Sequence, residues 1–214
     1  MMQEALAEPA SVRHARPANR LLVREVLFRD GLILALLAAC PLRRRSFVGL
    51  EPGRHLVRHS DRYRLQLEPG DLKNGTDMTV PLPVSLTLWL DHYLAAVRPR
   101  LLQGRASPKL WVSRQGRPMT CNSLALRVEK VTGRRLGRRL GMHLFRHCAA
   151  TSLALEAPEH VRQIPALLGH RRLATSERYY NLAEGSTAAA SYQEGLLALR
   201  RRLQEEARRP QRRG

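Results

Sequence analysis

The pattern of apolar and polar positions along the chain predicts a mostly helical protein. Residues 23–39 are predicted to form a helix that overlaps the run GLILALLAAC at residues 31–40. This run is apolar on most sides, as is typical of a helix at the centre of a domain. The Cys40-Pro41 pair interrupts this helix, because proline cannot continue the backbone hydrogen bonding. Further helices are expected at residues 43–50, 85–102, 121–136 and 142–156, and in two short segments that end at Leu168 and near Tyr180.

Two segments, residues 54–59 and 62–67, alternate basic and apolar residues as strands with one buried face do. These two segments are predicted to pair as a β-hairpin. The turn residues of EPGDLKNGTD lead to a third strand at residues 78–82, and residues 110–113 are expected to form an isolated extended piece. The predicted fold class is mainly α with a small antiparallel three-stranded β-sheet.

The end of the chain is predicted to form a separate helix. Gly185-Ser186-Thr187 is expected to break the chain after Tyr180, and residues 188–209 carry an apolar stripe on an arginine-rich segment. Such a stripe needs a surface to cover it. The expected organisation is a flexible N-terminal tail at residues 1–20, a domain at 21–185, and a C-terminal amphipathic helix with a basic tail at 186–214.

The charge of the chain indicates a polyanionic partner. It has 37 Lys and Arg against 18 Asp and Glu, a formal net charge of +19. Only Lys73, Lys109 and Lys130 are lysines, so nearly all of the positive charge is arginine, which binds phosphate in a bidentate manner. A genome rich in Arg codons would explain the choice of Arg over Lys but not the sign of the balance. The expected partner is a polyanion, most simply nucleic acid.

The remaining composition argues against several other classes of protein. Three cysteines without C-x-x-C spacing suggest neither a disulfide framework nor a zinc site. The N-terminus lacks the apolar stretch of a secretory signal, and GLILALLAAC is too short to span a bilayer. We therefore expect a cytoplasmic, nucleoid-associated protein that uses no membrane, metal or cofactor.

The candidate chemistry lies in the second half of the chain. His143-Leu-Phe-Arg146 falls on a predicted helix, where a spacing of three places both side chains on one face. The same spacing recurs at residues 55–58 and 59–62, but on a strand it points the two side chains to opposite faces. A tyrosine pair, Tyr179-Tyr180, follows in an arginine-rich stretch, where it is not expected to fill a core.

These motifs resemble the tyrosine recombinase (phage integrase) family, whose pattern is H-x-x-R, then L-G-H, then a nucleophilic tyrosine nine residues on. HLFRH and LLGH fit the first two parts, and Tyr179 lies nine positions after His170 whereas Tyr180 does not. CPLRRRSFVGL matches the family's earlier arginine box with Arg43 in register, and Lys73 stands eight residues before Pro81, where the family places a lysine. The resemblance covers about residues 21 to 181.

The resemblance implies a catalytic domain that breaks and rejoins DNA. Tyr179 would attack the phosphorus and form a 3′-phosphotyrosyl bond. Lys73 would act as general acid towards the leaving 5′ oxygen, and His143 would orient the phosphate or assist proton removal. No metal is required, because arginines take the part that Mg²⁺ has in nucleases.

The two arginines of the motifs would hold the scissile phosphate. Arg43 and Arg146 would clamp its non-bridging oxygens, and His170 would add a third donor. As part of a charge run, Arg43 also has the simpler interpretation of a solvated surface residue. The neighbouring arginines expected to contact DNA are Arg44, Arg45, Arg171 and Arg172.

Three features depart from the family pattern, and the last of them leaves a second hypothesis open. Ser46 stands where the family often has Glu, and Leu144 where it often has Asp. About twenty residues precede the catalytic domain, too few for the N-terminal clamp domain of active members. The alternative is therefore a clampless remnant that binds DNA without productive recombination. In the enzyme hypothesis the chain forms a homo-oligomer on DNA, with the C-terminal helix docked in trans.

Overall fold

The computed structural model describes residues 2–3, 17–73, 75, 77–165 and 177–208. They form two compact units, divided between Ala149 and Ala150. The long helices are α2 (Pro17–Ala39), α6 (Cys121–Leu136), α7 (Met142–Glu156) and α9 (Glu177–Arg208). The shorter elements are α3 (Arg44–Gly49), η1 (Pro69–Asp71), η2 (Val84–Leu86), α4 (Thr87–His92), η3 (Tyr93–Val97), α5 (Arg98–Leu102) and η4 (Pro158–Gln163).

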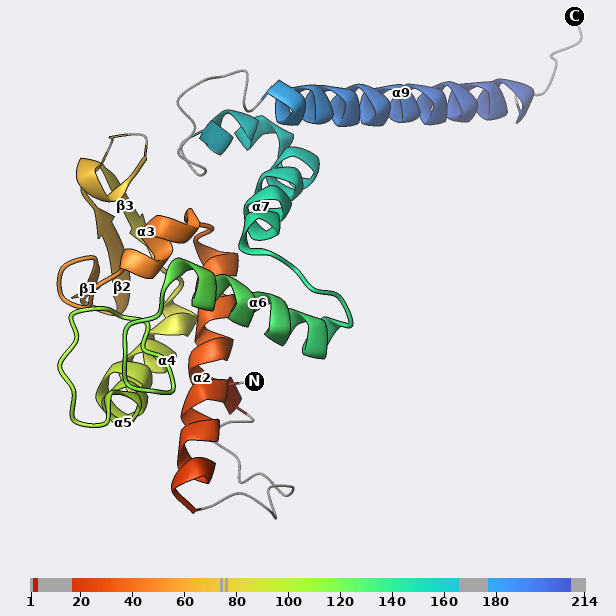
Figure 1. Ribbon diagram of the computed structural model, residues 1–214. Helices are drawn as coiled ribbons and strands as arrows, with labels where there is room; N and C mark the ends of the chain where they lie inside the picture. The colour runs from red at the N-terminus through yellow and green to blue at the C-terminus, as the bar shows by residue number, and fades with distance from the viewer. Residues whose placement is uncertain (1, 4–16, 74, 76, 166–176, 209–214) are drawn as a thin grey trace, which may run out of the picture. The chain divides into compact units, whose positions relative to one another are not determined.

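The predicted three-stranded sheet is confirmed. The strands β1 (Leu56–His59), β2 (Arg62–Leu67) and β3 (Met78–Pro81) lie in the order β1-β2-β3, and both pairs are antiparallel (Figure 1). Tyr63, Leu65 and Leu67 on β2 are buried, because side chains of a strand alternate between its two faces. The fold class, mainly helical with one small antiparallel sheet, is the one expected from the sequence.

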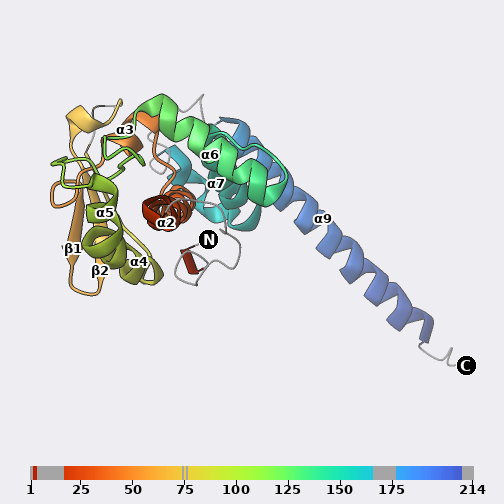
Figure 2. The same ribbon diagram turned by 60° about the horizontal axis from the view of Figure 1, so that its bottom comes forward.

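Helix α2 is the central element of the first unit. It contacts α5, α6 and η3, and Figure 2 shows it nearly end-on, with α4 and α5 on one side and α6 on the other. Its buried side chains include Phe28, Leu32, Leu36 and Leu37. The apolar run at its end therefore forms the core, as its pattern predicted.

This central helix also buries an ionic cluster that its apolar pattern did not indicate. Arg29 donates through Nη2 to Oδ1 of Asp30 at 2.7 Å and through Nη1 to the carbonyl of Val112 at 2.7 Å. Arg127 on α6 donates through Nε to Oδ2 of Asp30 at 2.6 Å. The buried carboxylate thus joins α2 to α6, and Arg29 joins both to the extended segment at Val112.

The segment around Trp111 connects the core to α3. Trp111 is fully buried, stacks on Phe47 with ring centroids 5.2 Å apart, and donates from Nε1 to the carbonyl of Phe47 at 3.0 Å. The hydroxyl of Tyr93 donates to the carbonyl of Leu110 at 2.9 Å. These contacts fix α3, and with it the arginine run at its start, against the core.

The helical segment expected at residues 85–102 is confirmed, and it consists of η2, α4, the π-helical η3 and α5 in succession. The break expected at Gly185-Ser186-Thr187 is wrong, because α9 runs through it without interruption and no short helix ends near Tyr180 within the described residues. A single helical glycine costs only about 1 kcal/mol, and the hydroxyl of Thr187 donates to the carbonyl of Ala183 at 2.9 Å. Among the helices that the structure describes, none is long and apolar enough to cross a membrane.

Candidate active site

Arg146 lies in α7 and is held against the start of the arginine run. Its side chain is buried, and Nη1 donates to the carbonyl oxygen of Pro41 at 2.5 Å. Pro41 precedes Arg43 by two residues, so the hydrogen bond joins the two predicted arginine motifs. Burial and this bond restrict the orientation of the planar guanidinium, which suits a group that must meet phosphate oxygens at a fixed angle.

Arg43 is the residue that caps the N-terminus of α3. Its backbone is extended, with φ −63° and ψ 146°, and its carbonyl accepts the backbone N–H of Phe47 at 2.9 Å. The side chain of Arg43 is half-buried, whereas Arg44 and Arg45 are exposed. Arg43 therefore differs from its two neighbours, and the solvated-surface interpretation fits only Arg44 and Arg45.

His143 and Arg146 both belong to α7, as their spacing predicted, but their environments differ. His143 is exposed, and its ring meets that of His147 edge-on with centroids 5.8 Å apart. The side chain of Arg146, one turn later, is buried. His143 is accordingly open to a bound substrate, while Arg146 is anchored by the protein.

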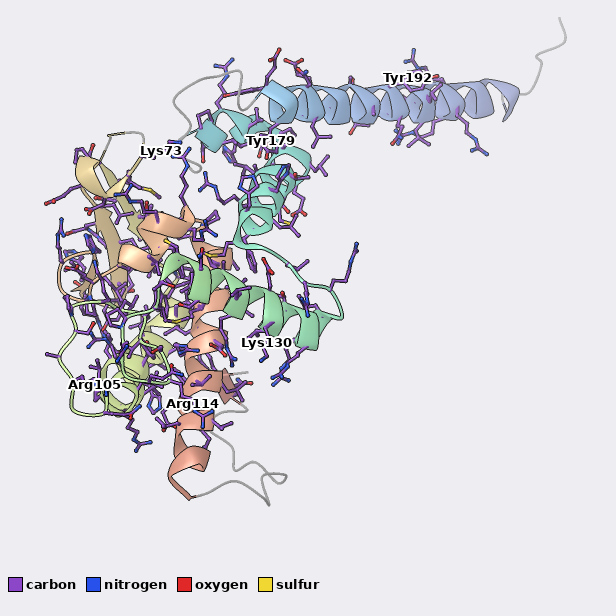
Figure 3. The ribbon with its side chains drawn as sticks, in the orientation of Figure 1. Lys73, Arg105, Arg114, Lys130, Tyr179 and Tyr192 are labelled. Carbon is purple, nitrogen blue, oxygen red and sulfur yellow. The ribbon has the colours of Figure 1, made fainter. Side chains whose placement is uncertain are left out.

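Lys73 is exposed in the turn between β2 and β3, and Figure 3 shows its side chain projecting from the first unit. The turn is attached to α3 by Ser46, whose hydroxyl donates to the carbonyl of Asp71 at 2.8 Å. Lys109, by contrast, is engaged by Glu51 at 2.8 Å. Ser46 and Asp71 were not among the predicted site residues, because a serine in a helix and an aspartate in a turn are common and carry no signal of their own.

Tyr179 belongs to the second unit, where it is only 3% exposed. It packs in an apolar cluster with Ala150, Ala154, Ile164 and Ala183. The expectation that the tyrosine pair does not fill a core is therefore wrong for Tyr179, because α9 turns this residue towards α7 and η4. Tyr180 is half-buried.

The structure thus places Arg43, Lys73, His143 and Arg146 in one compact unit and Tyr179 in the other. His170, Arg171 and Arg172 lie outside the described residues. Among the residues that are described, no group of three or more His, Cys, Asp or Glu side chains is arranged to hold a metal ion.

Burial and the charge of Arg146 also determine the pKa of the nearby Cys40 thiol. Burial raises the pKa of Cys40 to about 12, and the positive charge of Arg146 offsets part of that rise. Cys40 therefore stays protonated at neutral pH and is a packing residue rather than a nucleophile.

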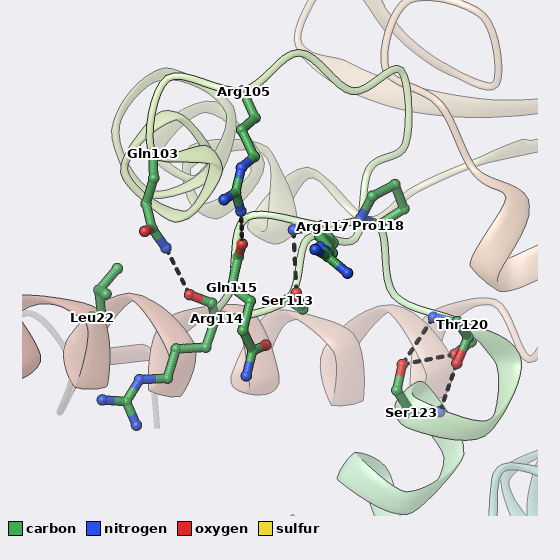
Figure 4. Close-up of a pocket in the computed structure, with 10 residues that line it drawn as sticks. All are labelled: Leu22, Gln103, Arg105, Ser113, Arg114, Gln115, Arg117, Pro118, Thr120 and Ser123. Carbon is green, nitrogen blue, oxygen red and sulfur yellow. Dashed lines mark hydrogen bonds between the residues drawn. The ribbon is translucent and has the colours of Figure 1, made fainter.

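A second basic feature of the first unit is a hollow of about 840 Å³ beside the N-terminus of α6. Arg105, Arg114 and Arg117 line it, and none of the described lining residues is acidic (Figure 4). The carbonyl of Arg114 accepts from Gln103 at 2.7 Å, and that of Arg117 accepts the backbone N–H of Ser113 at 2.7 Å. With three arginines and no acidic residue among its described lining residues, the hollow is basic.

Comparisons with known proteins bear on the family and the fold of this chain. A model described as the phage integrase family matches residues 22–185. Tyrosine recombinase XerC 2 of Ralstonia nicotianae is 34% identical over 156 residues, which cover 72% of this chain and 43% of that protein. Tyrosine recombinase XerD of Proteus mirabilis is 32% identical over 161 residues, covering 72% of this chain and 48% of that protein. The chain thus spans about half the length of these relatives.

Two solved structures share the fold. The XerH site-specific recombinase bound to its palindromic difH substrate, in a post-cleavage complex, has a TM-score of 0.62 at 20% identity, and covers 89% of this chain and 49% of that chain. The XerA recombinase has a TM-score of 0.59 at 19% identity, and covers 88% of this chain and 67% of that chain.

Proposed function

This chain belongs to the phage integrase family, and from this premise we propose that it acts in site-specific recombination or integration. It would do so by cleaving and rejoining DNA strands. The observation that supports this most directly is the hydrogen bond from Arg146 to the Pro41 carbonyl. It brings the helix of the H-x-x-R motif to the segment that carries Arg43, as a phosphate clamp requires.

In the proposed reaction, the positive groups stabilise the phosphate as its charge grows. Arg43 and Arg146 contact the non-bridging oxygens, and His170 adds a third hydrogen bond. Donors fixed in advance stabilise the pentavalent transition state more than the ground state. The anchored guanidinium of Arg146 supports this role, since little reorganisation is needed when substrate binds.

The covalent step exchanges one phosphate ester for another. The phenolic oxygen of Tyr179 attacks phosphorus and loses its proton with the assistance of His143. The bond between phosphorus and the 5′ oxygen breaks, and the Lys73 ammonium gives a proton to that oxygen. Religation reverses each transfer, so the phosphotyrosyl bond conserves the energy of the original ester.

Duplex DNA is the proposed substrate, and relatives with known structures support it. The XerH structures contain bound difH substrate. In this chain, the exposed Arg44 and Arg45 adjoin Arg43. The hollow lined by Arg105, Arg114 and Arg117 supplies a further basic surface, which we assign to phosphates flanking the cleaved one.

The second candidate function is a DNA-binding module that does not recombine. The burial of Tyr179 in an apolar cluster favours it, because a nucleophile packed in a core cannot reach a phosphate. Under the enzyme hypothesis, α9 must release Tyr179 when DNA binds. Under the module hypothesis, Tyr179 stays in the cluster and only the arginines act.

The enzyme hypothesis includes assembly of several copies on DNA. Among the described side chains of α9, Ala183 is the last buried one, and those of residues 184–197 are all exposed. They include Tyr192, Leu196 and Leu197, which present apolar area that the described residues leave exposed. We assign that surface to a second copy of the chain. Deleting residues 188–214 should then spare cleavage at a single site and abolish pairing of two sites.

A covalent trapping experiment tests the proposed function. The full chain is incubated with nicked duplexes of random sequence, from which the short strand released by cleavage diffuses away. An adduct that survives denaturation and carries DNA by its 3′ phosphate supports the recombinase. Binding to the same duplexes without any adduct supports the DNA-binding module.

A further inference from the structure

The turn that carries Lys73 is attached to α3 by one buried hydroxyl. Asp71, the last residue of η1, lies two residues before Lys73. Its backbone carbonyl accepts the hydroxyl of Ser46 at 2.8 Å, and Ser46 is buried. Because Arg43 caps the helix that contains Ser46, this hydrogen bond connects the helix that starts at Arg43 to the segment leading into Lys73.

The side chain of Asp71 lies next to a buried histidine, His55. Oδ2 of Asp71 accepts the backbone N–H of Glu68 at 3.1 Å and lies 3.2 Å from Nε2 of His55. Nδ1 of His55 accepts the backbone N–H of Glu51 at 3.0 Å. Since Nδ1 is an acceptor, the proton of the neutral ring lies on Nε2, facing the carboxylate. This contact is electrostatic, because its geometry is not that of a hydrogen bond.

The loop that presents His55 is itself fixed. Lys109 donates to the carboxylate of Glu51 at 2.8 Å and to the carbonyl of Gly49 at 3.3 Å. The chain that follows α3 is therefore anchored at Gly49 and Glu51. A contact between Arg54 and Asp71, 3.6 Å apart, involves a half-exposed arginine and contributes little, as exposed ion pairs generally do.

We propose that Ser46, acting through the Asp71 carbonyl, positions Lys73 for proton transfer to the leaving 5′ oxygen, with His55 holding the carboxylate of Asp71. This inference rests on the role of Lys73 proposed above. Ser46 is a positioning residue and does not touch the reacting atoms. A general acid must come within hydrogen-bond reach of the atom it protonates, and a lysine side chain is flexible. The backbone of its turn is the part that the fold can restrain.

The hydrogen bond that Ser46 makes to the Asp71 carbonyl requires a donor such as a hydroxyl. A carboxylate at this position cannot donate to a carbonyl, so the glutamate that the family often has here would not make this contact. Ser46→Thr retains the donor, and Ser46→Ala removes it with the loss of a single oxygen atom. Ser85, an exposed serine of η2, provides the matched control Ser85→Ala.

The test compares two leaving groups in single-turnover cleavage by the full chain. One substrate has the natural bridging 5′ oxygen and the other a bridging 5′ sulfur, which leaves as a thiolate and needs no general acid because thiols are far more acidic than alcohols. On the oxygen substrate, we expect Lys73→Ala to lower the rate about 10²–10⁴-fold. Ser46→Ala should lower it about 10-fold or more, because orientation is lost. Both variants should cleave the sulfur substrate at about the rate of the original chain. Ser46→Thr and Ser85→Ala should cleave both substrates at nearly the original rate.

Each other outcome has a defined meaning. A Ser46→Ala defect of equal size on both substrates would show that Ser46 supports folding or Arg43 and would overturn the proposal. The proposal would also be overturned if Ser46→Ala cleaved the oxygen substrate as fast as the original chain does. Failure of the original chain to cleave either substrate, or of Lys73→Ala to slow the reaction, would instead refute the proposed function.

A measurement without chemistry tests the attachment by itself. Amide hydrogen exchange of a peptide spanning residues 68–78 should be faster in Ser46→Ala than in the original chain or in Ser46→Thr, because the turn loses its hydrogen bond to α3. Thermal unfolding of the three proteins controls for global stability. Equal exchange in all three would overturn the proposal whether or not the chain cleaves DNA.

Discussion

Nη1 of Arg146 donates a hydrogen bond to the carbonyl oxygen of Pro41 at 2.5 Å, although 105 positions separate the two residues in the chain. The bond joins the first turns of α7 to the segment before α3. It also places a fixed positive charge next to the buried thiol of Cys40. A guanidinium held in this way can orient a phosphate without first being ordered itself.

Removing either clamp arginine should affect cleavage much more than binding. We expect Arg43→Ala and Arg146→Ala to lower the cleavage rate about 10²–10³-fold, the usual effect of losing one donor to a developing charge. Duplex affinity should fall far less, because the proposed function gives the chain many other arginines for contacts with phosphates. Single-turnover cleavage and duplex titration measure the two effects.

The exposed neighbour Arg44 serves as the control for this prediction. Arg44→Ala changes the net charge as much as Arg43→Ala does, so it should alter affinity similarly and leave the cleavage rate nearly unchanged. The thermal unfolding of Arg146→Ala should also be measured, because the Pro41 carbonyl loses its buried donor in this variant and the fold could be less stable. Parallel losses of binding and cleavage in the Arg43 variant would mean that this residue only holds DNA.

The covalent adduct should depend on Tyr179 and not on Tyr180. Tyr179→Phe removes the nucleophilic oxygen and should abolish the adduct, whereas Tyr180→Phe should retain it. Because phenylalanine also fits the apolar cluster with Ala154 and Ile164, Tyr179→Phe should keep the fold. Denaturing electrophoresis and peptide mapping identify the modified residue, and an adduct mapped to Tyr180 would contradict the nine-residue spacing.

The buried carboxylate of Asp30 should be essential for stability. Asp30→Ala leaves the buried Arg29 and its neighbour Arg127 without their shared partner. Breaking one side of a buried ion pair typically costs about 3–5 kcal/mol, so the free energy of unfolding should fall by that amount in urea titrations. Asp77→Ala, at an exposed position, should change it little. A loss below about 1 kcal/mol at Asp30 would show that water replaces the contacts.

The basic hollow should contribute to duplex binding in a salt-dependent way. If Arg117 neutralises a phosphate, Arg117→Ala should reduce the slope of log affinity against log salt by about 0.9. Arg62→Ala provides the control, because Asp61 already engages Arg62. Equal slope changes in the two variants would show that the hollow has no special part in binding.

The thiol of Cys40 should resist modification while the protein is folded. With a pKa raised to about 12 by burial, it has no appreciable thiolate at pH 8, whereas Cys148 is exposed. Alkylation at pH 8 should therefore label Cys148 first and Cys40 only after unfolding, as mass spectrometry can show. The ordinary pKa of this thiol is 9.0. Above that pH, Cys40 has lost its proton in the unfolded chain but still holds it in the folded protein. The contribution of Cys40 to stability should accordingly be lost as pH rises from about 9 to 12.

The sequence by itself determined the helices, the hairpin and the order of the chemical motifs, because these depend on local periodicity and fixed spacing. The apolar run of residues 31–40 had to be buried for the most part, and a spacing of three on a helix had to bring His143 and Arg146 to neighbouring turns. Local signals failed at Gly185-Ser186-Thr187, because a weak helix breaker does not end a helix whose neighbours favour it.

Only the tertiary structure decided which of these residues are anchored and by what. The contacts of Arg146 with Pro41 and of Ser46 with Asp71 cross 105 and 25 positions of chain and end on backbone carbonyls. Every residue has a carbonyl, so no side-chain pattern can mark the one that is used. Likewise, the burial of Tyr179 depends on how α9 packs on the end of α7 and on η4, and spacing along a single helix does not specify its neighbour.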